Sequence, residues 1–190
     1  MIEYIVEKIC DNDDEKKIIR FGLERFKIVV ISLALIIITG SLLNETIRSI
    51  MFVVCILPLR QNAGGYHMKN SQTCAVFSYI LFLLLILCIK FLDADYRICI
   101  LTWIGCFVLI LLLAPIGTEN HQLDMAEKKV YGRRSRFICC IESALFLILV
   151  YFRKAYWYKV ILFAEINETV LLVIGKIQES KREKESTYDI

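Results

Sequence analysis

The sequence predicts an all-α integral membrane protein, a bundle of about six transmembrane helices preceded by N-terminal amphipathic helices. Hydrophobic residues make up 57% of the 190 positions, and the mean hydropathy of +0.59 is too high for an ordinary soluble domain. The apolar residues form continuous runs rather than the alternating pattern of a β-barrel strand. Two prolines and eight glycines leave few helix breakers. At this length we expect a single membrane domain.

Residues 1–27 form the predicted amphipathic segment. Apolar residues recur there at helical spacing on either side of the acidic run 11–14. This pattern is typical of two interfacial helices separated by a turn. Mixed charges precede the first apolar run and no small-residue cleavage site follows it, so we do not expect a cleaved signal peptide.

The membrane domain is expected over residues 28–176, with a charged tail over 177–190. A helix needs about 20 residues to cross the hydrocarbon core. The second apolar segment is short, carries Arg48 and ends at Pro58. We expect it to tilt, to thin the bilayer locally or to bury its end in protein, which would leave the following connection below the headgroups. The six apolar segments are 28–43, 46–59, 75–92, 96–116, 136–152 and 155–175.

The distribution of basic residues orients this bundle. If both termini are cytoplasmic, 17 of the 23 Lys and Arg residues fall on the inner side and 6 on the outer side. The positive-inside rule favours this orientation over its reverse. The connection at 60–74 and the charged tail then face the cytoplasm, where thiols stay reduced. A formal charge of only +3, without a basic face carrying interleaved aromatics, gives no indication of nucleic-acid binding.

The connection at 60–74 contains a candidate catalytic pair, His67 and Cys74. On one unbroken helix these residues would lie about 10 Å apart along the axis. That separation is too large for a hydrogen bond, so the chain must bend between them. We expect Ser71 to cap the next helix and Cys74 to lie in its first turn, where the positive end of the helix dipole favours the thiolate.

Other residues of the connection supply candidate substrate contacts. Gly64 and Gly65 allow positive φ angles and close approach to a substrate, so their amides are candidates for an oxyanion site. Arg60 adds a cation nearby. In the plainer alternative, the glycines form a turn between two membrane helices and Cys74 is an inert apolar residue. Three amides are candidates for orienting the imidazole, and the last is also a candidate substrate contact: Gln61, Asn62 and Asn70.

The string Arg-x-x-Ala-Gly-Gly-Tyr-His over 60–67, followed by Cys74, resembles the signature of the AgrB family. Members of this family are membrane cysteine endopeptidases that process the propeptide of a bacterial quorum-sensing autoinducer. A second stretch, 114–120 with the basic residues up to Arg136, looks like the family's other cytoplasmic loop. The family usually has a basic residue and a proline shortly after Asn120, where this chain has His121 and Gln122.

The resemblance implies a function for these motifs. Cys74 would form a thioester with the substrate, release its C-terminal tail and promote thiolactone or lactone cyclisation, with His67 as base and no cofactor or metal. The partner would be an AgrD-like propeptide at a bacterial cell membrane, and a homodimer is plausible for so small a bundle. Four basic residues would bind the acidic propeptide tail or anchor the chain on anionic lipid: Lys128, Lys129, Arg133 and Arg134.

Other functional classes have less support in the sequence. A peptide exporter or a membrane scaffold would use Gly64-Gly65 as a hinge, but no ATP-binding loop is present. A metalloprotease would need a ligand set such as His-Glu-x-x-His, which the sequence lacks. Glu165 and Glu168 interrupt the last apolar segment. Carboxylates in hydrocarbon are costly, so these either pair within the bundle or line a substrate path.

Overall fold

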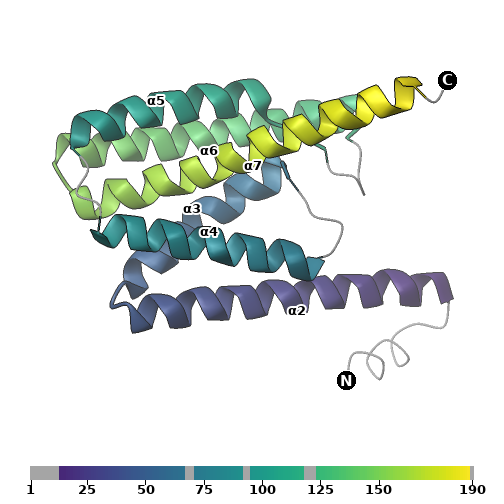
Figure 1. Cartoon of the computed structure of the whole chain (residues 1–190), viewed down its shortest axis with the longest axis horizontal. Helices are drawn as coiled ribbons and strands as arrows, with labels where there is room; N and C mark the ends of the chain where they lie inside the picture. The colour runs from purple at the N-terminus through teal and green to yellow at the C-terminus, as the bar shows by residue number, and fades with distance from the viewer. Residues whose placement is uncertain (1–12, 67–70, 92–94, 118–122, 189–190) are drawn as a thin grey trace.

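The computed structural model describes residues 13–66, 71–91, 95–117 and 123–188, which form six helices and no extended strand (Figure 1). The predicted all-α class is therefore confirmed. The helices are α2 (Asp13–Leu42), α3 (Thr46–Ala63), α4 (Ser71–Phe91), α5 (Tyr96–Leu113), α6 (Met125–Tyr151) and α7 (Ala155–Tyr188). Each predicted apolar segment corresponds to one of these helices.

Two helices extend beyond the predicted segments into charged sequence. The boundary drawn after residue 27, between the amphipathic segment and the first apolar run, lies inside α2, which is continuous from Asp13 to Leu42. At the other end, α7 continues through the charged tail to Tyr188. Both extensions are rich in Lys, Arg and Glu, which are good helix formers, and contain no proline. The first expected interfacial helix, before residue 13, lies outside the described residues.

The start of α6 is defined by a capping box. The Glu127 N–H donates to Asp124 Oδ1 at 2.7 Å, and the Asp124 N–H donates to Glu127 Oε2 at 3.1 Å. These reciprocal bonds satisfy two backbone donors at the helix start. As a result, α6 begins before its apolar segment, and its basic residues lie on helical turns instead of in a loop.

The helices run up and down, with α7 at the centre of the bundle. α7 packs against α3, α5 and α6, while α2 packs against α3 and α4. In Figure 1 the beginnings of α2 and α4 lie at the same end of the molecule as the end of α7. The ends of α3 and α5 point toward that end, so the α3–α4 and α5–α6 connections both belong to it.

The distribution of polarity differs from that in a water-soluble helical domain, because carboxylates are buried beside the apolar core and many large apolar side chains are exposed. Glu165, Glu168 and Ser135 are fully buried, whereas Leu101 and Leu112 are 72% and 75% exposed. Large exposed apolar surfaces in a helical protein mark contact with lipid or a partner. Within the described part of the chain, α5 is the one helix that is long and apolar enough to cross a membrane, and Ala75–Phe91 of α4 is a shorter apolar stretch. The crossing of all six helices therefore stays a prediction.

Candidate active site

The α3–α4 connection leaves the helical path at a pair of glycines. α3 ends at Ala63 and α4 begins at Ser71, so the chain does not run as one rod through the motif. Gly64 and Gly65 have φ angles of 74° and 103°, values that glycine adopts without the strain of a Cβ. A Cβ on Gly64 would also overlap the carbonyl oxygen of Ile116. Glycine is therefore required here by conformation and by packing.

The glycine pair docks against the segment that follows α5. The Ile116 N–H donates to the Ala63 carbonyl at 3.0 Å, and the Gly65 N–H donates to the Ile116 carbonyl at 3.4 Å. The Gly64 N–H donates back to the Arg60 carbonyl at 3.2 Å. Both glycine amides are thus bonded within the chain. In this arrangement they are not free to serve as the oxyanion donors expected from the sequence.

The next residue, Tyr66, is fixed on α7. Its N–H donates to the Leu171 carbonyl at 2.9 Å. The approach depends on Gly175, because a Cβ there would come within 2.7 Å of the Tyr66 nitrogen. The connection therefore lies between the segment after α5 and the last third of the apolar part of α7.

Arg60 holds this connection from the last turn of α3. Its Nη1 donates to the Gly64 carbonyl and its Nη2 donates to the Tyr66 carbonyl. Nη1 also lies 3.7 Å from Oε1 of Glu168, a side chain with no exposed surface. Arg60 was expected to contact a substrate carboxylate or oxyanion. The structure places its guanidinium instead among acceptors of its own chain, where it fixes the backbone that leads to His67.

The Tyr66 ring links the connection to α4. Its centroid lies 6.1 Å from that of Phe77, in an edge-to-face arrangement at 76°. Phe77 is three residues after Cys74, whose backbone lies in the first turn of α4, as expected from the sequence. Helix α4 includes Ser71 as its first residue, so Ser71 lies within the helix and not at the expected cap position before it. His67 and Asn70 lie outside the described residues, and Cys74 is placed by its backbone alone.

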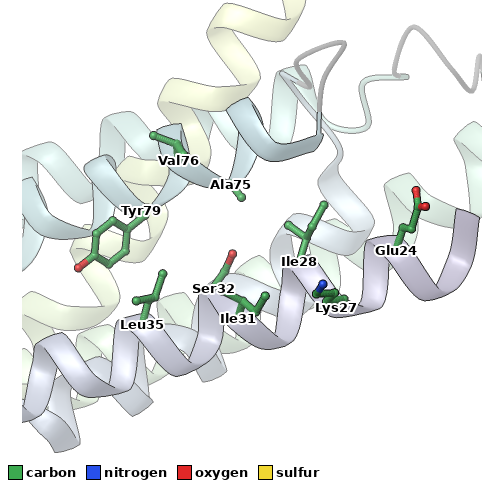
Figure 2. Close-up of a pocket in the computed structure, with 9 residues that line it drawn as sticks. All are labelled: Glu24, Lys27, Ile28, Ile31, Ser32, Leu35, Ala75, Val76 and Tyr79. Atoms are coloured by element: carbon green, nitrogen blue, oxygen red, sulfur yellow. The ribbon is translucent and has the colours of Figure 1, made fainter. Parts of the chain in front are cut away.

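Two clefts open beside the first turns of α4. One, of about 620 Å³, lies between α2 and α4, and Figure 2 shows Ile28 and Leu35 of α2 facing the α4 side chains Ala75 and Tyr79. The other, of about 230 Å³, lies between α2, α3, α4 and α7. Ile28 and Ala75 line both clefts. Since Ala75 directly follows Cys74, both clefts adjoin the helix start that carries the candidate nucleophile.

The basic residues of α6 lie at the same end of the bundle. A hollow of about 360 Å³ is lined by Lys128, Lys129, Gly132, Arg133 and Arg136. Arg134, also expected in this group, is exposed but does not line the hollow. A Cβ on Gly132 would lie 3.1 Å from the ring of Pro115, and the residue after this proline pairs with Gly64. Three of the four expected residues therefore gather beside the connection.

The sequence profile of the family AgrB, accessory gene regulator B, matches residues 1–172. This chain belongs to the AgrB family. It is 24% identical over 134 residues to an AgrB-like protein of Clostridium perfringens (strain SM101 / Type A), covering 67% of this chain and 63% of that protein. It is also 24% identical over 136 residues to AgrB-like protein 2 of Clostridium perfringens (strain 13 / Type A), covering 66% and 64%. The chain thus matches slightly less than two thirds of each relative's length. No solved structure matches it.

The AgrB match includes both connections at the site. The candidate pair and the basic hollow fall within residues 1–172, as does Leu171. Gly175, which admits Tyr66 to α7, lies just beyond the match. The resemblance noticed in the motif from Arg60 to Cys74 therefore extends over most of this chain, although identity with the two relatives is low.

Sequence reasoning missed the distant partners of the AgrB motif. Glu168 was recognised as an unusual carboxylate in an apolar segment, but its pairing with Arg60 was not predicted. Ile116, Leu171 and Gly175 carried no signal beyond their apolar or small character. Glu165 pairs within the bundle, one of the two roles considered for it, because the Ser143 hydroxyl donates to its Oε1 at 3.3 Å.

Proposed function

We propose that this AgrB family chain is a multi-pass bacterial membrane endopeptidase that cleaves the C-terminal tail of a quorum-sensing propeptide through a thioester on Cys74. The main support is the attachment of Tyr66 to both α7 and α4, because it fixes the chain on either side of the candidate pair. His67 directly follows Tyr66 in the chain. Cys74 precedes Phe77 by three residues in α4.

The proposed chemistry begins with the Cys74 thiolate attacking the carbonyl carbon of the scissile peptide bond. A carbon–sulfur bond forms, the carbon–nitrogen bond breaks, and the protonated His67 gives its proton to the departing amine. A thiol or hydroxyl of the retained peptide then attacks the thioester and gives its proton to His67; the carbon–sulfur bond to Cys74 breaks, which closes a thiolactone or lactone ring and releases the Cys74 thiolate. Exchange between thioesters is nearly isoenergetic, so no cofactor or metal is required. A site recessed from water protects the thioester from hydrolysis.

The basic hollow of α6 is the proposed site for the acidic tail of an AgrD-like propeptide. Lys128, Lys129 and Arg133 line it within reach of the connection. Arg134, exposed on the same turns, adds to the local positive potential. These residues also suit a second role as anchors on anionic lipid, since basic residues next to a membrane bind acidic headgroups. Both roles place this end of the bundle at the cytoplasmic surface.

The distribution of polarity supports a bundle that crosses the membrane several times. Buried carboxylates with exposed apolar side chains suit helices that face lipid and pack through polar contacts. The beginning of α2, the end of α7 and the start of α4 belong to the basic end, so the positive-inside rule assigns them to the cytoplasm. A homodimer is proposed as the working unit, because a single bundle of this size encloses little of a peptide.

Co-expression with the short peptide encoded beside this gene, followed by mass spectrometry of the products, tests the proposal. We expect the tail fragment to disappear with Cys74→Ala and with His67→Ala. Cys88→Ala, a matched change later in α4, should retain cleavage. Tail release that survives Cys74→Ala would overturn thiol catalysis. Export of the intact peptide without cleavage would favour an exporter.

A further inference from the structure

A buried amide lines the smaller of the two clefts, and its oxygen has no hydrogen-bond partner among the residues that the structure describes. Asn167 of α7 is 6% exposed, and its Oδ1 accepts no hydrogen bond from the described residues. The same residue lines the cleft between α2, α3, α4 and α7. Leaving a buried polar atom unpaired costs about 1–3 kcal/mol. The oxygen itself has almost no exposed surface, so the amide must turn toward the cleft to accept from a donor that enters it.

The remaining walls favour a neutral, apolar occupant. Ile36, Phe52 and Leu57 are among the mainly apolar residues around the cleft. The charged residue in the wall is Arg60, whose guanidinium is already held by two backbone carbonyls and faces the Glu168 carboxylate. Charge in the wall is thus balanced by the protein itself, and an ionic ligand would find no unmatched opposite charge.

The size of the cleft distinguishes between apolar occupants. Its volume of about 230 Å³ is below the roughly 300–1,000 Å³ of pockets that enclose a whole small ligand, and suits one large side chain. A peptide brings such a side chain together with a backbone N–H for Asn167. A lipid acyl chain brings no donor and would leave the amide oxygen unpaired.

The position of the cleft indicates which part of a peptide it receives. Ala75 and Ser78 of α4 line it immediately after Cys74. The basic hollow lies beyond the pairing of Gly64 with Ile116, around Gly132. If the hollow takes the departing acidic tail, the retained part of the substrate extends toward the cleft.

We propose that this cleft is the specificity subsite for a large apolar side chain next to the scissile bond, on its N-terminal side, with Asn167 accepting a substrate backbone N–H. This inference rests on the proposed endopeptidase function. Asn167 is then a binding residue, and Leu57 is one of the apolar residues in the wall of the subsite.

The first test uses the full-length protein in lipid nanodiscs and the propeptide encoded beside its gene. The propeptide residue before the scissile bond is set to Leu, Ala or Lys, and kcat/KM is measured for each. If the cleft is the subsite, kcat/KM for the Leu peptide should exceed that for the Ala peptide by at least about tenfold, the range for a hydrophobic pocket that loses several methylenes. The Lys peptide should have the lowest kcat/KM. Equal values for all three would overturn the subsite while leaving the endopeptidase in place. Absence of cleavage by the wild type would overturn both.

Variants of the wall give the second test. Leu57→Trp should shorten the cleft and lower the Leu-to-Ala preference at least about fivefold. Asn167→Leu should raise KM about tenfold for all three peptides, with kcat within about twofold. Val54→Trp is the matched control, because Val54 lies on the same helix with its side chain 63% exposed. An unchanged preference in Leu57→Trp, with an unchanged KM in Asn167→Leu, would show that the cleft is occupied by something other than the substrate.

Discussion

At the scale of single residues, the position of the α3–α4 connection depends on the guanidinium of Arg60. Arg60 holds the Gly64 and Tyr66 carbonyls with two different nitrogens and faces the fully buried Glu168. A planar fork can hold two carbonyls and a carboxylate at once, whereas a lysine ammonium is a compact donor on a flexible stem. Arg60 is therefore a positioning residue for the backbone that carries His67.

Arg60→Lys tests this role. The variant keeps the charge opposite Glu168 but loses the paired carbonyl contacts, so the backbone before His67 should shift. A misplacement of about 1 Å at a catalytic group costs on the order of 100-fold in rate, and we expect a 10- to 100-fold lower kcat for tail release. KM should change less than kcat, because the lysine keeps the positive charge that Arg60 places in the wall of the cleft.

The matched control for this change is Arg97→Lys, an exposed arginine near the start of α5. It should retain wild-type kcat. Wild-type kcat in Arg60→Lys, at equal amounts of inserted protein, would contradict a positioning role for the guanidinium fork.

At the scale of elements, the α3–α4 connection meets the segment after α5 and helix α7. The backbones approach closely at both contacts because glycines stand there. Gly64 meets the backbone of Ile116, and Gly175 of α7 meets the backbone of Tyr66. These close approaches allow hydrogen bonds from the connection to the segment after α5 and to α7. The junction thus positions the α3–α4 connection by backbone contacts, with glycine required at each approach.

Gly64→Ala should disrupt this junction. The alanine must adopt a positive φ and its Cβ overlaps the Ile116 carbonyl, so we expect a loss of about 2 kcal/mol or more in the free energy of unfolding, with loss of cleavage. Gly105→Ala is the control, because a Cβ at this position in α5 has no neighbour within 4 Å. Thermal unfolding in detergent measures the stability of both variants. Equal midpoints for the two variants would contradict the assigned packing.

At this scale, the bounds of single helices were predicted better than the contacts between helices. The length of an apolar run and the polar or glycine residues that end it can be read locally from the sequence. The bounds predicted for the helices at 46–59 and 75–92 therefore lie within four residues of α3 and α4. The helical extension of α7 was missed because charged residues were assumed to end the helix with the apolar segment. The pairing of Arg60 with Glu168 was missed for a different reason. It joins positions 108 residues apart, and their proximity depends on how α3 packs against α7.

At the scale of the whole molecule, charge and polarity give the bundle a direction. The basic hollow, the beginning of α2 and the end of α7 belong to one end. The turns at Asn44 and Arg153 belong to the other. Buried carboxylates and exposed apolar side chains between the two ends match a bundle solvated by lipid.

Labelling of introduced cysteines tests this orientation. Lys154→Cys, in the α6–α7 turn, should react with a membrane-impermeant maleimide on intact cells above the background of the unsubstituted chain. Ser180→Cys, in the helical tail, should react only after the cells are opened. The reverse pattern would place the candidate site on the outer surface and contradict the assigned topology.

The central claim is that the start of α4 and the imidazole of His67 together make Cys74 a reactive thiolate. The most direct measurement is its alkylation rate at pH 7 in the intact protein, located by peptide mapping. Only a few per cent of an ordinary exposed thiol is ionised at this pH, so we predict that Cys74 reacts about 10- to 30-fold faster than a cysteine introduced at Ser180, and that His67→Ala removes most of this difference. Equal rates at the two positions, unchanged by His67→Ala, would contradict the account.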